Sequence, residues 1–135
     1  MNAQEYAQRY AAAQVTVVDR ERLLLLVLEG GARFLRLTRD ALAADDLRGF
    51  GEALARAQAI IAELHGTLDH EVGGAITKDL ARLYNFMLFH LTEANTKKSL
   101  RHVDEVIGVY TTIADAFRAV LERPATERAA TTAAA

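Results

Sequence analysis

Apolar residues recur along this chain at alternating spacings of three and four, which keeps them on one face of an α-helix. Four long segments carry this pattern, and short polar or glycine-containing breaks at residues 44–46, 69–74 and 96–99 separate them. Because the breaks are short, we expect consecutive helices to run in opposite directions. The pattern predicts an all-α protein, an antiparallel up-down four-helix bundle with a short N-terminal helical arm.

The first long helix is expected to begin at Asp19, a residue type that caps helix N-termini, and to end near Ala43. Its apolar positions cover a wide arc, which indicates burial on more than one side. Gly30 and Gly31 interrupt it at a cost of about 1 kcal/mol each relative to alanine. This cost suggests that another backbone approaches closely there. The expected core face comprises Leu23, Val27, Phe34, Leu37 and Ala41, with Leu24, Leu28 and Leu35 beside it.

The other three helices have clearer boundaries. Asp45 or Asp46 is expected to cap the second helix, and Ser99 the fourth. The adjacent Gly73 and Gly74 allow a positive φ and a sharp reversal before the third. The expected core stripes are Leu47, Phe50, Leu54, Ala57, Ile61, Leu64 and Leu68; Ile76, Leu80, Leu83, Met87, Leu91 and Ala94; and Leu100, Val103, Ile107, Tyr110, Ala114, Phe117 and Leu121.

The chain carries more apolar surface than one bundle seam requires. The fourth helix has a second stripe, Val106, Val109, Ile113 and Val120, so that its apolar arc spans about 160° where about 100° would suffice. On the third helix, Tyr84 sits beside the core stripe, and Phe86 and Phe89 lie on the opposite flank. Two interpretations stay open, a generous core with the N-terminal arm folded over it or a groove for a partner helix.

The two ends differ from the middle of the chain. Residues 3–13 favour helix, and their large apolar side chains, Tyr6 and Tyr10, lie four apart on one face. Such a short arm is not stable alone. After Glu122 no large apolar residue follows, which is typical of a disordered tail. We therefore divide the chain into an arm (1–18), a helical bundle domain (19–122) and a disordered tail (123–135).

Composition excludes several classes of protein. With 16 Lys and Arg against 18 Asp and Glu, the chain lacks the basic excess of nucleic-acid-binding proteins. Without cysteine, it forms no disulfide and no thiolate metal site. The N-terminus does not read as a signal peptide, and the longest purely apolar run, residues 23–28, is too short to cross a membrane. These features predict a protein without membrane insertion, and the lack of cysteine fits a reducing compartment.

The motifs of catalysis and metal binding are also missing. Di-iron bundles use Glu-x-x-His, but none of the four histidines follows a glutamate at that spacing, and His90 with Glu93 gives only the reversed order. The sole serine, Ser99, is better explained as a helix cap. The glycines do not form a phosphate-binding loop. We therefore expect neither enzymatic activity nor a cofactor or metal.

Two stretches carry ordered motifs at matched spacing. In the first, Tyr10 precedes Val15 by five residues, and a capping Asp19 leads into a leucine-rich run that ends at Gly30. The second, residues 68–95, contains LDHEVGGAI, LARLYNFM and LTEAN in that order. Together they resemble the FliS family of flagellar secretion chaperones for flagellin. In the first stretch, Asp19, Arg20 and Leu28 replace the Ser, Pro and Tyr of the family pattern.

The resemblance implies a cytoplasmic export chaperone, monomeric or a weak homodimer, that binds the C-terminal segment of flagellin and blocks its premature polymerisation. The flagellar export gate would be a further partner, and no cofactor is implied. By the same resemblance, Tyr10 and Val15 would cover apolar surface in the free protein. The implied partner-binding residues are Tyr6, Tyr10, Val15, Tyr84, Phe86, Asn95, Val106 and Ile113. The alternative is a non-chaperone bundle for oligomerisation or an adaptor role.

Overall fold

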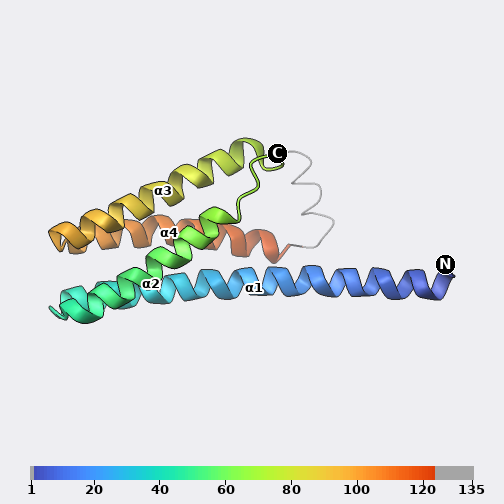
Figure 1. Ribbon diagram of the computed structural model, residues 1–135, viewed down its shortest axis with the longest axis horizontal. Helices are drawn as coiled ribbons and strands as arrows, with labels where there is room; N and C mark the ends of the chain where they lie inside the picture. Colours follow the sequence, from blue (N-terminus) through green and yellow to red (C-terminus); the bar gives the residue numbers. More distant parts are fainter. Residues whose placement is uncertain (1, 124–135) are drawn as a thin grey trace.

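The computed structural model describes residues 2–123, apart from the side chains of residues 15–18. This part forms four α-helices, α1 (Ala3–Ala43), α2 (Leu47–Gly66), α3 (Gly74–Lys97) and α4 (Leu100–Leu121). Each helix runs against the one before it (Figure 1). Both α1 and α3 pack against α2 and α4. The all-α prediction is confirmed, whereas residues 124–135 of the predicted tail lie outside the described residues.

The predicted breaks between helices are confirmed, together with the residues that form them. The Asp46 carboxylate accepts a hydrogen bond from the Gly49 backbone N–H at 3.0 Å and so caps α2. Gly74 adopts a φ of +56° at the start of α3, a conformation that a side chain would strain. Ser99 caps α4 by accepting from the His102 backbone N–H at 3.3 Å. Local turn chemistry therefore fixes where these three helices start.

The predicted start of the first helix at Asp19 is wrong. Instead α1 begins at Ala3, where the Asn2 side chain accepts from the Glu5 backbone N–H at 2.8 Å, and it continues without a break to Ala43. No glycine or proline stands between residues 1 and 29, and an aspartate inside a helix costs well under about 1 kcal/mol. Asp19 therefore lies inside α1 and does not cap it, because no residue before it ends the helix.

The core lies between all four helices and contains two buried tyrosines. Burial raises the pKa of both Tyr84 and Tyr110, so both phenols stay neutral. The Tyr110 hydroxyl donates to the Leu28 carbonyl of α1 at 2.7 Å. Among the described residues, the largest fully buried apolar side chains are Leu28, Leu35, Phe50, Ile61, Tyr84, Met87, Leu91, Val103, Val106 and Tyr110.

The buried face of α1 differs from the predicted one. Leu28, Gly31, Leu35 and Thr38 are buried, whereas Leu23 and Leu37 of the predicted core face are exposed. The apolar run at residues 23–28 fits almost any helical phase, so it could not fix the orientation of the helix. Glycine and threonine, which an apolar pattern does not count, occupy two of the four buried positions.

The glycine pair in α1 accommodates side chains, which corrects the expectation of a close backbone. A Cβ on Gly31 would overlap the Tyr110 hydroxyl and touch Ile60, while a Cβ on Gly30 would meet only Ile60 at an ordinary 3.8 Å. Gly31 is therefore needed to admit the Tyr110 ring, whereas Gly30 has room for a methyl group.

The wide apolar arc of α4 follows from its two neighbours, since α4 packs on both α1 and α3. Val106 and Ile113, from the second stripe, are buried, and Val109 is partly buried against the core. Only Val120 of that stripe is substantially exposed. Most of the second stripe therefore belongs to the core, and on α4 the exposed part of this stripe is Val120 near the C-terminal end.

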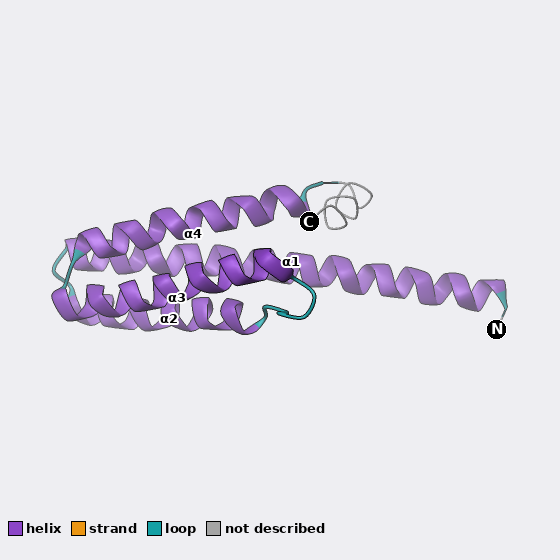
Figure 2. Ribbon diagram, turned by 90° about the horizontal axis from the view of Figure 1, so that it is seen from above, coloured by secondary structure: helices purple, strands orange, loops and turns teal. Residues whose placement is uncertain are grey.

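The N-terminal arm is the first part of α1 and extends beyond the ends of the other helices (Figure 2). Tyr6 is 67% exposed and Tyr10 62% exposed, and the Tyr10 hydroxyl accepts from the Gln14 amide at 3.0 Å. The expectation that Tyr10 covers apolar surface is therefore wrong in this structure. The side chain of Val15, predicted to do the same, lies outside the described residues.

Candidate partner-binding groove

An apolar groove of about 370 Å³ lies between the first half of α3 and the last half of α4. From α3, Ile76, Leu80 and Leu83 recur at spacings of four and three, so they share one face of the helix. The facing residues on α4 are Thr112, Ile113, Ala116, Phe117 and Val120. Both halves of this lining belong to regular helices, which hold the groove in a fixed shape.

Three bulky side chains of the groove are open to solvent. Ile76 is 56% exposed, Val120 39% and Leu83 38%, although the pattern predicted Ile76 and Leu83 to lie in the core. Leu80 and Phe117 are partly buried beneath them, and Ile113 forms the buried floor at 5% exposure. Contiguous exposed apolar surface of this kind is typical of a site that another protein covers.

The groove offers shape and apolar surface but no reactive group. No charged side chain lines it, and its one hydroxyl, on Thr112, donates to the Gly108 carbonyl of its own helix at 3.1 Å. Neighbouring charges pair along their own helices, Asp79 with Arg82 and Asp115 with Arg118. Such a surface suits the apolar face of an amphipathic helix.

The opposite end of the α3–α4 pair is held closed by polar contacts. His90 and Glu105 lie 2.6 Å apart, His102 and Glu93 3.4 Å apart, and the two imidazole rings stack at a centroid distance of 4.3 Å. The hydrogen bond from His90 lowers the pKa of Glu105, and a hydrogen bond with Lys97 lowers that of Glu93. Because these contacts lie next to the α3–α4 loop, the helices separate only at the other end, where the groove opens.

The structure places the sequence-predicted partner-binding residues in several different environments. Ile113 is the one described member that lines the groove. Phe86 is exposed on α3 and stacks on His90 at 4.8 Å, and Asn95 is exposed and accepts from Lys98 at 2.8 Å. Tyr6 and Tyr10 lie on the projecting arm.

Tyr84 and Val106 of the predicted set are core residues. They are 1% and 0% exposed, so they present no surface to a partner in this conformation. Their positions in the helical pattern are compatible with either role, and only packing distinguishes a core position from a surface position. The groove residues that sequence reasoning assigned to the core instead are Ile76, Leu80, Leu83 and Phe117. Their location near helix ends, where neighbouring helices diverge, was the signal that could have identified them.

Two other classes of site were considered. Among the described side chains, no group of three or more His, Asp or Glu is arranged to hold a metal ion. No helix in residues 2–123 has both the length and the hydropathy needed to cross a membrane.

The family model described as Flagellar protein FliS matches residues 2–124. The chain is 35% identical over 102 residues to the flagellar secretion chaperone FliSB of Pseudomonas aeruginosa, covering 76% of this chain and 81% of that protein. It is 32% identical over 116 residues to FliS of Salmonella typhimurium (85% and 86% covered) and 29% identical over 119 residues to FliS of Bacillus subtilis (88% of each). This chain therefore belongs to the FliS family of flagellar secretion chaperones.

Proposed function

We propose that this protein is a cytoplasmic export chaperone that binds the C-terminal segment of flagellin, prevents its premature polymerisation and aids its secretion by the flagellar export apparatus. The observation that carries this proposal is the open apolar groove between α3 and α4, whose lining is free of charge. A secretion chaperone must cover apolar surface of its client until export, and this groove is where the bundle leaves apolar surface uncovered.

The expected binding mode is a client segment that folds as an amphipathic helix in the groove. Burying apolar area contributes about 25 cal/mol per Å², and ordering the client offsets part of this gain. Binding would thus be strong enough to protect the client and still reversible at the export apparatus. The absence of charge in the lining makes the binding energy depend on the exposed side chains of Ile76, Leu83 and Val120.

The groove is tested by placing a charge in it. We expect Leu83→Glu and Val120→Glu each to weaken binding of a flagellin C-terminal segment by about tenfold or more, because a carboxylate would be desolvated beneath the client. Both side chains are exposed in the free protein, so the fold should tolerate the change. Titration calorimetry gives the affinities, and circular dichroism checks the fold.

The matched control is Leu47→Glu, since Leu47 is similarly exposed but lies at the start of α2, outside the groove. Its affinity should equal that of the wild type. Equal loss in all three variants would show a general effect of charge and would contradict the groove assignment. A stable dimer that ignores flagellin would instead favour the oligomerisation or adaptor alternative.

The remaining predicted contacts are proposed to serve other parts of the assembly. Tyr6 and Tyr10 project away from the bundle on the arm, so we assign them to the export gate as the second partner. Phe86 and Asn95 are exposed on α3 and remain proposed partner contacts. Val15 is proposed with the arm on its sequence position alone.

A further inference from the structure

Two stacked histidines, which take no part in the groove, join α3 to α4 at the loop end of this helix pair. The rings of His90 on α3 and His102 on α4 lie at a centroid distance of 4.3 Å, 29° from parallel. Their side chains are 16% and 8% exposed. Histidine ordinarily changes its charge between about pH 5 and 8. The stack therefore places two titratable rings in contact across a packed helix interface.

With both rings neutral, the polar contacts of the two histidines match donor to acceptor. Nε2–H of His90 donates to the Glu105 carboxylate at 2.6 Å. Nε2 of His102 faces the Glu93 carboxylate at 3.4 Å, so its proton belongs there, and Nδ1 then accepts from the Ser99 hydroxyl at 2.6 Å. Because Ser99 also caps α4, the neutral rings are tied to the start of that helix.

A first additional proton fits on His90. Its Nε2 lies closer to a carboxylate than Nε2 of His102 does, and the Phe86 ring stacks on it at a centroid distance of 4.8 Å. An aromatic face stabilises a neighbouring cation, and a charge-assisted hydrogen bond to Glu105 is stronger than a neutral one. The contact between α3 and α4 therefore stays closed when one ring is charged.

A second proton is opposed by the arrangement of the rings. It would place two positive charges in contact at 4.3 Å, where the burial of His102 limits screening by water. It would also occupy Nδ1 of His102, so the Ser99 hydroxyl would lose the acceptor to which it donates. Charging both rings therefore separates them and disturbs the cap of α4.

The neighbouring carboxylates do not cancel this repulsion, because each already faces a permanent cation. Glu93 pairs with Lys97 at 3.2 Å, and Glu105 pairs with Arg101 at 3.5 Å. These four charges balance while both rings are neutral. Each proton added to the rings then leaves an excess of positive charge.

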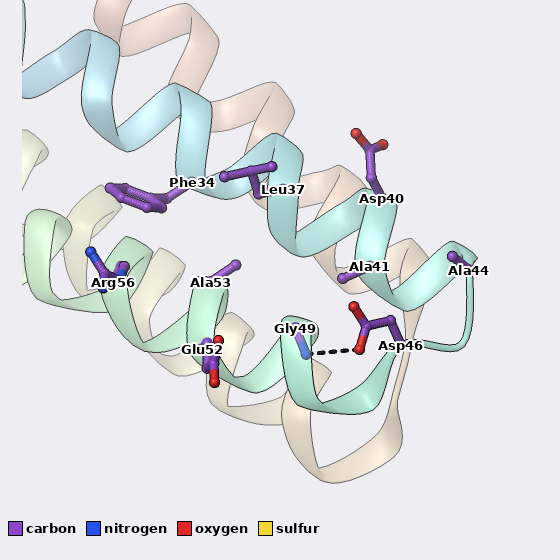
Figure 3. A pocket seen from close by; sticks show the side chains of 10 residues that line it. All are labelled: Phe34, Leu37, Asp40, Ala41, Ala44, Asp46, Gly49, Glu52, Ala53 and Arg56. Atoms are coloured by element: carbon purple, nitrogen blue, oxygen red, sulfur yellow. Dashed lines mark hydrogen bonds between the residues drawn. The ribbon is translucent and has the colours of Figure 1, made fainter.

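Charges from the other elements at this end of the bundle have partners of their own. Arg39 of α1 donates to Asp104 of α4 at 2.7 Å, and Lys98 in the α3–α4 loop donates to Asn95 at 2.8 Å. At the α1–α2 turn, which lies at the same end (Figure 1), Asp46 is engaged as the cap of α2 (Figure 3). The charge of the two rings therefore depends chiefly on their own neighbours on α3 and α4.

We propose that His90 and His102 form a proton-controlled latch, which holds the loop ends of α3 and α4 together with one added proton or none and opens when both rings are charged. The groove lies at the other end of the same two helices, so opening the latch changes the angle between them and the shape of the groove. Acidification then weakens client binding. This last consequence rests on the proposed function, whereas the latch itself does not.

NMR of the histidine rings in the free full chain, from about pH 8 to about pH 4, measures the proton steps. We expect the two rings to take up their protons in separate steps at least about one pH unit apart. In His90→Gln, whose amide can still donate to Glu105, His102 should titrate at a higher pH than in the wild type. The control His70→Gln, which removes an exposed histidine, should leave both steps unchanged. Identical His102 curves in the wild type and His90→Gln would overturn the proposal.

Amide hydrogen exchange of residues 91–103 measures the opening of the loop end. At a pH where both rings are charged, these amides should exchange at least about fivefold faster in the wild type than in His90→Gln, relative to the ratio of the two proteins at about pH 8. Comparing the proteins at one pH removes the intrinsic pH dependence of exchange. An unchanged ratio would show that the second proton leaves the helices closed and would refute the latch.

Calorimetry with the flagellin C-terminal segment tests the consequence for the groove. Affinity should fall at least about fivefold in the wild type when the second ring becomes charged, and should stay within about twofold in His90→Gln. An equal fall in both proteins would contradict the coupling between latch and groove. A segment that binds at no pH would contradict the proposed function, while the two measurements on the free protein would still decide the latch.

Discussion

At the scale of single residues, the contact between Gly31 and Tyr110 shows how one missing side chain shapes the bundle. The Tyr110 ring crosses from α4 to α1 and donates to the Leu28 carbonyl, and only a glycine at position 31 leaves space for it. The sequence predicted that another backbone lies close to the glycine pair, whereas the structure places side chains there. The sequence could not show that a tyrosine side chain lies there, because the partner is nearly eighty residues away along the chain.

Replacing Gly31 by alanine should destabilise the protein by about 2 kcal/mol, because the methyl group displaces the buried Tyr110 hydroxyl while the helix gains propensity. Replacing the adjacent Gly30 should instead stabilise it by up to about 1 kcal/mol, since a Cβ there meets ordinary contacts. Urea unfolding followed by circular dichroism gives both free energies. Equal effects of the two substitutions would contradict the assigned role of Tyr110.

At the scale of elements, the α3–α4 pair is closed at its loop and open at its far end. Ser99 caps α4, and its hydroxyl lies 2.6 Å from Nδ1 of His102, which stacks on His90. These contacts hold the loop end, while Ile76 and Val120 stay exposed at the other end. Helix patterns predicted both helices and the cap. The opening between them depends on the angle at which the two helices cross. The apolar pattern of one helix carries no information about that angle.

Glu105 links this closed end to pH. The hydrogen bond with His90 lowers the pKa of Glu105 below its ordinary value of 4.5, and the positive charge of Arg101 lowers it further. The carboxylate is therefore stabilised in the folded state. A lowered folded pKa contributes stability that is present above about pH 4.5 and is lost as the pH falls through the folded pKa. Glu105→Gln should therefore lose less stability on acidification than the wild type does.

Urea unfolding at a series of pH values from neutral to below the pKa of Glu105 measures this difference. Glu63→Gln, at an exposed position on α2, serves as the control and should follow the wild-type curve. The interpretation would be wrong if the Glu105→Gln and wild-type curves stayed parallel throughout the acidic range.

At the scale of the whole molecule, α1 divides into a half that packs in the bundle and a half that projects from it (Figure 2). Tyr6 and Tyr10 stand five helical turns, or 18 residues, before Leu24 and Leu28, so they continue the face that packs inside the bundle. Within residues 2–123, the Tyr6 and Tyr10 side chains on this face stay largely exposed. The arm thus adds little to the stability of the free bundle.

Deleting residues 2–18 should change the free energy of unfolding by less than about 0.5 kcal/mol, because the deleted side chains that the structure describes are all exposed. Asp19 would then cap the shortened helix. Affinity for the flagellin segment should stay within about twofold of wild type, whereas binding to the soluble part of the export gate should be lost.

Chemical denaturation measures the stability of the deletion variant, and calorimetry measures each binding. Adding the double substitution Tyr6→Ala/Tyr10→Ala in the full chain controls for the change in length. A large loss of stability would show that the arm packs on the bundle and would contradict the division at residue 18. Loss of flagellin binding would place the arm in the client site.

The sequence by itself determined the four helical segments, the breaks between them and the starts of α2, α3 and α4, because caps, glycines and apolar periodicity act over a few neighbouring residues; only the start of α1, at Ala3 and not at Asp19, was predicted wrongly. The ordered motifs of residues 10–30 and 68–95 also pointed to the correct family. The tertiary structure alone decided which apolar residues face a neighbour and which face solvent. Tyr84 and Leu83 are adjacent in sequence, yet one is core and the other lines the groove. That difference depends on where helices distant in sequence diverge, and a local pattern contains no information about such distances.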